Sequence, residues 1–256
     1  MPTYRLDIAY DGSDFFGYAK QPELRTVQGD LESALFIFTG PVETFVAGRT
    51  DKGVHATDQV VSFTTRELDM ARVKRSLNSM LAPSIAVLRI SRVDDDFHAR
   101  YSATGRAYEF RIHNSAVHDP FRSSLTWTYA PRLDADAMDA AVQCLVGERD
   151  FAAFCRRRGD SLMIRRVEWA QWGRSDDIVE MSIGAKAFCH QMVRSIVALS
   201  VEIGAGRMDV SDMQRVLESG DRSIAKGAAP AKGLTLVAVS YGDETLPRPA
   251  WIPDTS

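Results

Sequence analysis

One carboxylate lies between two cations, with a glycine on either side of the three, in the stretch Ala47-Gly48-Arg49-Thr50-Asp51-Lys52-Gly53-Val54-His55-Ala56. An apolar run leads into it and another leads out of it, which is typical of a polar loop between two strands. A rigid scaffold presents reactive groups on such loops, and glycines let a ligand approach the backbone closely. Asp51 beside Arg49 is expected to stay ionised. A plain surface turn with a salt bridge is the alternative interpretation of this composition.

The bulk composition is that of a soluble globular protein. Of its 256 residues, 45% are hydrophobic and 25% are charged, and this length fits one large domain or two of ordinary size. No apolar run approaches the roughly 20 residues that cross a bilayer, so no membrane segment is expected. The N-terminus enters a strand pattern directly and does not resemble a signal peptide.

The cysteines Cys144, Cys155 and Cys189 lack C-x-x-C spacing. An odd number without metal-ligand spacing favours reduced thiols over a disulfide framework or a zinc site. We therefore expect a cytoplasmic protein without a bound metal.

Charge distribution is more informative than the net charge of −3, because a protein neutralises phosphates with a local patch. Basic residues cluster in three places: Arg72, Lys74 and Arg75; Arg100, Arg106 and Arg111; and Arg156, Arg157, Arg158, Arg165 and Arg166. Each cluster alone is typical of a solvated surface. Three in one chain are compatible with an anionic polymer as the partner.

The first hundred residues alternate strand and helix patterns. Residues 3–10 predict a half-buried strand, and Thr26 is expected to cap a helix that runs to about Phe38. Strands are expected at about 43–49 and 59–65, a helix at 69–81, and a buried strand at 84–93. This β-α-β-β-α-β order is that of a ferredoxin-like domain.

The second half repeats the plan loosely. Strands are expected near 106–112, 125–129, 162–173, 178–185 and 234–241, and helices near 137–145, 188–203 and 210–219. We expect an α+β protein with two ferredoxin-like α/β domains, whose mainly antiparallel sheets join across a central active-site cleft. The expected bounds are 1–104 for the N-terminal domain, 105–243 for the C-terminal domain and 244–256 for an irregular tail.

The sequence of this loop resembles the active-site loop of the tRNA pseudouridine synthase A family. The resemblance lies in Gly48-Arg49-Thr50-Asp51 followed by Gly53-Val54-His55-Ala56. Further similar stretches occur in family order at 10–17, 26–28, 97–103, 106–112, 188–194 and 229–236. The chain departs from the family pattern at Tyr18-Ala19-Lys20, at Phe110 and at 225–230. These departures concern contacts to RNA, because Asp51, Arg49, Tyr108 and Arg194 are all present.

The resemblance implies an isomerase that converts uridines 38, 39 and 40 of the tRNA anticodon stem-loop to pseudouridine. It implies a homodimer that binds tRNA and needs no cofactor or metal. By the same resemblance, Asp51 is catalytic, Tyr108 stacks on the uracil, Leu234 closes the pocket, and Arg49 and Arg194 keep Asp51 ionised. Candidate RNA contacts are His98, Arg100, Lys52, Arg72 and Arg75.

Several alternatives stay open on the residues alone. Tyr108 and Leu234 also fit ordinary core positions, Arg194 fits a helix arginine that reaches solvent, and His98 fits a hydrogen-bonded structural residue. A metal site formed by Asp51, His55 and Asp58 would need a helix, which Gly53 opposes. Cys189 next to His190 is more consistent with a buried thiol than with a nucleophile, since adjacent helix residues point about 100° apart.

A non-catalytic RNA-binding module is the alternative from another functional class. The presence of Asp51 argues against it. Whether the carboxylate adds covalently or assists a glycal-like intermediate is left open by the sequence.

Overall fold

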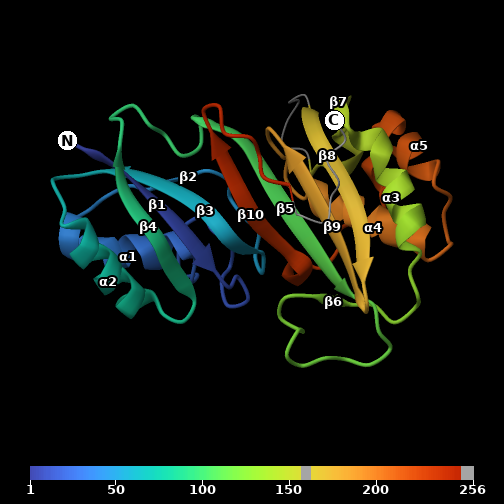
Figure 1. Ribbon diagram of the computed structural model, residues 1–256, viewed down its shortest axis with the longest axis horizontal. Coiled ribbons are helices and arrows are strands. Elements are labelled where there is room, and N and C mark those ends of the chain that lie inside the picture. Colours follow the sequence, from blue (N-terminus) through green and yellow to red (C-terminus); the bar gives the residue numbers. More distant parts are fainter. Residues whose placement is uncertain (157–162, 249–256) are drawn as a thin grey trace. The chain divides into compact units, whose positions relative to one another are not determined.

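Figure 1 shows the computed structural model of the chain, which describes residues 1–156 and 163–248. The chain forms two compact units. The first consists of Met1–Thr104 and Thr235–Thr245, and the second contains Gly105–Leu234. The second unit is therefore inserted between the main part of the first unit and the strand that completes it.

The first unit has the expected order of elements. These are β1 (Thr3–Tyr10), α1 (Val27–Thr39), β2 (Phe45–Val46), β3 (His55–Thr64), α2 (Met70–Leu81) and β4 (Ile85–Val93). The strand β10 (Leu234–Tyr241) returns from the far end of the chain and pairs in parallel with the start of β3. The resulting strand order is β4-β1-β3-β10, with β2 antiparallel to the far half of β3.

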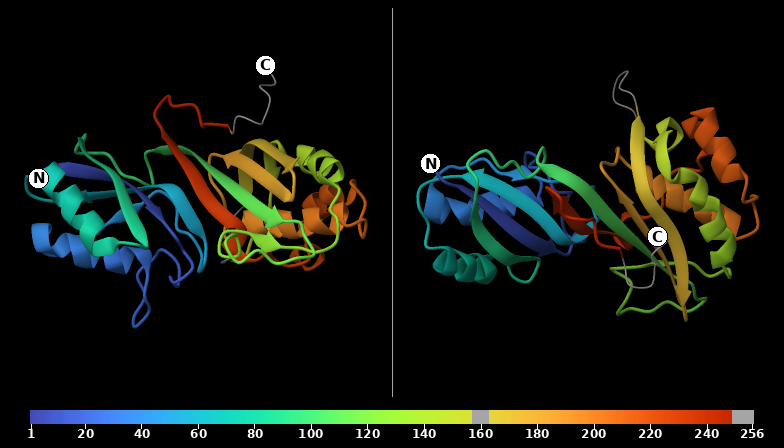
Figure 2. Two further views of the ribbon diagram at one scale, coloured as in Figure 1. Left: turned by 60° about the horizontal axis from the view of Figure 1, so that its bottom comes forward. Right: turned by 45° about the horizontal axis from the view of Figure 1, so that its top comes forward.

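Local signals account for the two helices of this unit. The Thr26 side chain accepts a hydrogen bond from the Gly29 amide at 3.2 Å, and Asp69 accepts one from the Arg72 amide at 3.0 Å. Each satisfies an amide at a helix start that has no partner within the helix. Figure 2 shows α1 and α2 beside each other against the first sheet.

Several strand predictions need correction, and the strands expected at 43–49 and 125–129 are limited to Phe45–Val46 and Trp127–Thr128. The stretch 84–93 was expected to be buried, but in β4 only Ile85 and Val87 are buried, and Leu88 is 47% exposed. Among the residues that the structure describes, β4 pairs only with β1, so it forms an edge of the first sheet with no strand partner on its other side. The strand expected from residue 59 already starts at His55, because Tyr10 pairs with Ala56.

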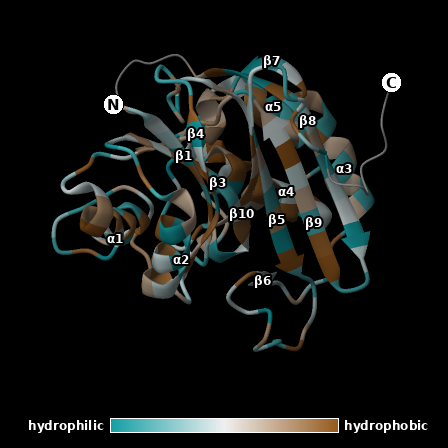
Figure 3. Ribbon diagram, turned by 60° about the vertical axis from the view of Figure 1, so that its left-hand side comes forward, coloured by the Kyte–Doolittle hydropathy of each residue, from teal (hydrophilic) through white to brown (hydrophobic). Residues whose placement is uncertain are grey.

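The second unit contains a mainly antiparallel sheet. Its elements are β5 (Ala103–His113), β6 (Trp127–Thr128), α3 (Ala135–Val142), β7 (Gly147–Asp150), β8 (Ile164–Ser175), β9 (Ile178–Ala185), α4 (Met192–Gly204) and α5 (Asp212–Ser219). The strand order is β5-β9-β8-β7, with β6 a short parallel partner of β5. Hydrophobic and hydrophilic residues alternate along β5 in Figure 3, as expected for a strand with two different faces. The α+β fold class is thus confirmed.

The helices of the second unit pack on its sheet. α3 lies against β8 and also against α4 and α5. α4 starts at Met192, later than the expected 188, because Gln191 has a left-handed backbone with φ of 64°. A β-carbon on Gly204 would lie 2.5 Å from the Met138 sulfur, so α3 and α4 are in close contact at their facing ends.

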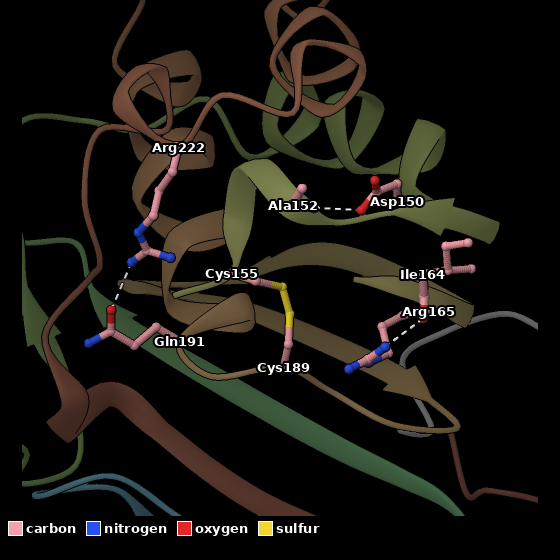
Figure 4. Close-up of a disulfide and its surroundings, with 8 residues drawn as sticks. All are labelled: Asp150, Ala152, Cys155, Ile164, Arg165, Cys189, Gln191 and Arg222. Atoms are coloured by element: carbon pink, nitrogen blue, oxygen red, sulfur yellow. Dashed lines mark hydrogen bonds between the residues drawn. A yellow bond between two sulfur atoms is a disulfide. The ribbon is translucent and has the colours of Figure 1, made fainter. Parts of the chain in front are cut away.

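The expectation of reduced thiols is wrong for two of the three cysteines. Cys155 and Cys189 form a disulfide, as Figure 4 shows. Their Cα atoms lie 5.7 Å apart. The Arg156 amide donates to the His190 carbonyl at 3.0 Å, so the backbones beside both cysteines already lie together. Sequence spacing cannot reveal this contact, because 34 positions separate the two residues. Cys144 is a free thiol, and burial raises its pKa.

Some predicted features lie outside the described residues. Arg157 and Arg158 belong to the undescribed 157–162, and most of the expected tail belongs to 249–256. In the described part of the chain, no helix has both the length and the apolar character needed to cross a membrane.

Candidate active site

Asp51 lies in the loop between β2 and β3 of the first unit and is half-buried. Its carbonyl accepts a hydrogen bond from the Val54 amide at 3.1 Å, which closes a four-residue turn. Gly53 is the third residue of this turn and has a φ of 79°, a conformation that suits glycine. The flanking cations Arg49 and Lys52 are exposed. The turn therefore presents Asp51 between two solvent-accessible positive charges.

Thr50, the residue directly before Asp51, anchors the loop. Its hydroxyl oxygen lies 2.8 Å from the Tyr10 hydroxyl oxygen, and its carbonyl accepts from the Tyr18 amide at 3.0 Å. Thr50 is buried. Because both its side chain and its carbonyl are held, the peptide that leads into Asp51 has little freedom to rotate.

Gln59 connects the sheet to the same loop. Its amide nitrogen donates to the Gly48 carbonyl at 2.7 Å and to the Tyr10 hydroxyl at 3.3 Å. Burial raises the pKa of Tyr10 to about 12, although its hydrogen bonds with Thr50 and Gln59 act in the opposite direction. Tyr10 therefore keeps its proton throughout the neutral range. Sequence reasoning did not single out Tyr10 or Gln59 for this role.

A second loop, residues 11–18, covers the Asp51 loop. Gly17 has a φ of 99°, and a β-carbon there would lie 3.1 Å from the Thr50 carbonyl oxygen. The Lys52 ammonium lies 3.9 Å from the centre of the Phe16 ring, in a cation–π contact. The aromatic character of this second loop thus has a structural reason.

His55 joins the two loops at their base. The buried His55 ring accepts a hydrogen bond at Nδ1 from the Gly12 amide at 3.0 Å, and the same nitrogen lies 3.1 Å from an Asp11 oxygen. Partial burial raises the pKa of Asp11, but hydrogen bonds from Ser13 and the nearby His55 outweigh it, so the net shift is downward.

The metal hypothesis for Asp51, His55 and Asp58 loses its geometric basis. His55 and Asp58 belong to β3, so the three residues do not share one face of a helix. Among the described residues, no group of three or more histidine, cysteine or carboxylate side chains is arranged to hold a metal ion. Burial and the neighbouring Asp7 raise the pKa of Asp58.

Tyr108, Arg194 and Leu234 belong to the second unit. Tyr108 is buried on β5, and its ring meets Phe188 edge to face at 5.0 Å between centres. Arg194 lies in the first turn of α4, where its Nε donates to the Ala229 carbonyl at 2.7 Å. Leu234 is the buried first residue of β10.

The candidate RNA contacts of the first unit fall into two groups. Arg72 and Arg75 are exposed on α2. His98 packs between Phe45 and Tyr101, with ring centres at 4.6 and 4.4 Å, and its Nδ1 accepts from the Arg100 amide at 3.1 Å. His98 therefore has a structural role in this turn, while Tyr101 is 76% exposed beside Arg100.

Comparisons with known proteins agree on one family. A family model described as tRNA pseudouridine synthase matches residues 8–102 and 141–242. The chain is 40% identical over 247 residues to a protein of Hyphomonas neptunium named tRNA pseudouridine synthase A, an alignment that covers 94% of this chain and 99% of that protein. It is 41% identical over 259 residues to the protein of the same name from Escherichia coli strain SE11, covering 97% and 94%.

One solved structure, a Cbf5-Nop10-Gar1 complex, matches with a TM-score of 0.34 and 13% identity. The match covers 77% of this chain and 45% of that one. This overlap is too small to establish a shared fold.

Proposed function

Because this chain belongs to the tRNA pseudouridine synthase family, we propose that it converts uridines 38, 39 and 40 of the tRNA anticodon stem-loop to pseudouridine with Asp51 as the catalytic residue. The enzyme is an isomerase that acts on uridine in tRNA. The observation that carries the assignment of Asp51 is its turn, which holds a half-buried carboxylate between Arg49 and Lys52 in a loop that hydrogen bonds tie to the first sheet.

The reaction needs a carboxylate and no outside group. The bond between ribose C1′ and uracil N1 breaks, the base turns, and a bond from C1′ to uracil C5 forms, while the C5 proton is lost and N1 gains one. Atoms and charge balance within the nucleoside and water. The Asp51 carboxylate either forms a transient covalent bond to the nucleoside, which breaks again as the product forms, or removes a ribose proton to give a glycal-like intermediate and returns that proton when the bond from C1′ to C5 forms.

The target uridine must leave its stack before it reaches Asp51, at a cost of a few kcal/mol. Stacking of the base on an aromatic ring offsets this cost by roughly 1–3 kcal/mol. Tyr108 is our candidate for that ring, and Leu234 for the apolar group that closes the pocket. Both assignments follow the family motifs at these positions.

Arg49 and Arg194 are our candidates for the cations that keep Asp51 ionised. A guanidinium next to a carboxylate stabilises the charged form and orients it. Arg49 is exposed beside Asp51, which leaves it accessible to a substrate phosphate as well.

Binding of tRNA is expected to depend on shape and backbone contacts, because three neighbouring positions are served by one site. Lys52, Arg72, Arg75 and Arg100 are exposed cations of the first unit and are our candidates for phosphate contacts. By family resemblance we also propose a homodimer that acts in the cytoplasm without a cofactor.

The experiment that tests this function measures tritium released from uridine labelled at carbon 5 in a tRNA transcript. The wild-type protein is expected to release tritium at positions 38, 39 and 40, and Asp51→Asn is expected to release none while it still binds the transcript. Binding without release by the wild type would instead identify an RNA-binding module.

A further inference from the structure

We propose that Tyr10 is a positioning residue for Asp51 and acts through Thr50. The inference rests on the proposed function, in which Asp51 is the catalytic residue. According to this proposal, the rate of the chemical step also depends on the Tyr10 hydroxyl group, which lies outside the reacting centre.

The contact that carries this inference is the 2.8 Å separation between the hydroxyl oxygens of Tyr10 and Thr50. Tyr10 is the last residue of β1 and is buried, so its ring is held by the sheet. Thr50 directly precedes Asp51 and has a second hydrogen bond, from the Tyr18 amide to its carbonyl. The Tyr10 hydroxyl thus joins the sheet to the residue that sets the direction of Asp51.

Gln59 makes a further hydrogen bond to the Tyr10 hydroxyl. Its amide nitrogen donates to the Tyr10 oxygen, which leaves the Tyr10 proton available for Thr50. The same amide nitrogen donates to the Gly48 carbonyl. Gly48 and Thr50 therefore both form hydrogen bonds with buried side chains of the sheet. These two residues lie on either side of Arg49 and come before Asp51 in the chain.

The pairing of β1 with β3 is irregular directly before Tyr10. Ile8 of β1 pairs with Gln59 of β3, whereas Tyr10 pairs with Ala56, so a β-bulge separates the two pairs. Bulges change the direction of neighbouring side chains and are common next to active sites. Without the bulge, Tyr10 would be opposite a different residue of β3, and its hydroxyl would be displaced from Thr50.

The expected consequence concerns the rate and not the binding of tRNA. Removal of the Tyr10 hydroxyl frees the Thr50 side chain, so the loop samples orientations in which Asp51 is misplaced. A displacement of about 1 Å at a reacting group costs up to roughly 100-fold in rate. The surface that binds tRNA is unchanged, because Tyr10 is buried.

Tyr10→Phe and Tyr4→Phe form a matched pair for the test. Tyr4 is also a buried tyrosine of β1, but its hydroxyl contacts Glu67 and the Leu68 amide instead of the Asp51 loop. Both variants lose one buried hydroxyl group and are expected to lose thermal stability to a similar degree.

Single-turnover rates of pseudouridine formation and tRNA dissociation constants are measured well below the unfolding temperature. Tyr10→Phe is expected to lower the rate about 10- to 100-fold with a dissociation constant within about 3-fold of wild type. Tyr4→Phe is expected to keep the wild-type rate. Equal rates for the two variants would overturn the inference.

Substitutions of Thr50 test whether Tyr10 acts through it. Thr50→Ser keeps the hydroxyl and is expected to retain most of the rate, whereas Thr50→Val is expected to match Tyr10→Phe. The double variant Tyr10→Phe/Thr50→Val should then be no slower than either single one, because both remove the same interaction. Additive losses would assign the two residues separate roles and refute the coupling.

Asp51→Asn separates failure of this inference from failure of the proposed function. If Asp51→Asn is inactive and Tyr10→Phe is as fast as Tyr4→Phe, only the positioning role fails. If Asp51→Asn retains the wild-type rate, the catalytic assignment itself fails, and the inference fails with it.

Discussion

The backbone of Gly12 passes so close to Val54 that a β-carbon at position 12 would lie 2.0 Å from the Val54 carbonyl oxygen. The obstacle is backbone, which cannot move aside as a flexible side chain can. The loop 11–18 and the Asp51 loop can therefore lie against each other only with glycine at this position.

Gly12→Ala is expected to push the two loops apart and to lower both stability and activity. Forced overpacking costs typically about 1–3 kcal/mol, with a larger loss when the backbone itself must shift. Urea unfolding and pseudouridine formation measure the two effects. Gly40→Ala is the control, because no atom of the described residues lies within 4 Å of the position its β-carbon would take. Its φ of +71° strains an alanine by itself, so it measures backbone strain without overlap, whereas Gly12→Ala measures overlap. A loss no larger than that of Gly40→Ala would contradict the close contact.

Lys52→Gln is expected to weaken tRNA binding and to lower the slope of log affinity against log salt by about 1, as for the loss of one phosphate contact. Lys52 is exposed, and its contact with Phe16 holds its side chain out beside Asp51. Arg92→Gln is the control, since Arg92 is exposed but paired with Glu67 at 3.0 Å. If the slope of log affinity against log salt is unchanged in Lys52→Gln, Lys52 makes no phosphate contact and its role is confined to the contact with Phe16.

Glu32→Gln is expected to destabilise the first unit by about 1–3 kcal/mol near neutral pH, because the carboxylate accepts several hydrogen bonds. Partial burial raises the pKa of Glu32, but hydrogen bonds from Lys20, Gln28 and Thr44 outweigh it and shift the pKa below the ordinary 4.5. A lowered folded-state pKa gives stability that is present above 4.5 and is lost as the pH falls below it.

The free energy of unfolding, measured against pH for wild type and variant, checks this dependence. The difference between the two proteins should be constant above pH 5 or so and should shrink as the pH falls toward 3. Asp30→Asn on the same helix removes a partly exposed ion pair with Arg25 and should change stability by less than about 0.5 kcal/mol. A difference that does not depend on pH would refute the role of the Glu32 charge.

Reduction of the disulfide between Cys155 and Cys189 is expected to destabilise the second unit. A cross-link across 34 positions lowers the entropy of the unfolded chain, which corresponds to about 3–4 kcal/mol. Unfolding in urea with and without a reducing agent measures this difference. Cys144→Ala should keep the response to the reducing agent and Cys155→Ala should lose it. Identical unfolding midpoints in oxidised and reduced wild type would contradict the prediction.

The elements whose signals are local were predictable from the sequence. Thr26 and Asp69 cap α1 and α2 as their positions before the helical patterns indicate. β7 has the sequence Gly-Glu-Arg-Asp, without an apolar residue, and its pairing with β8 is visible only in three dimensions. The exposure of β4 likewise follows from its place at the edge of the sheet and not from its own residues.

The candidate site divides in the same way. The Asp51 loop was recognised from the sequence, because the residues that form its motif are consecutive. The hydrogen bonds of Tyr10 were missed, since they join it to partners 40 and 49 positions away. A tyrosine at the end of β1, directly before a turn, was the one available signal. The disulfide was missed for the same reason of distance along the chain.

The return of β10 to β3 has a consequence for how the protein is made. His55 and Ala56 are synthesised before the whole second unit, and their partners Thr235 and Leu236 are synthesised after it. Until then the start of β3 is an open edge that other nascent chains can pair with. The first unit therefore gains its last strand only after the whole second unit has been synthesised.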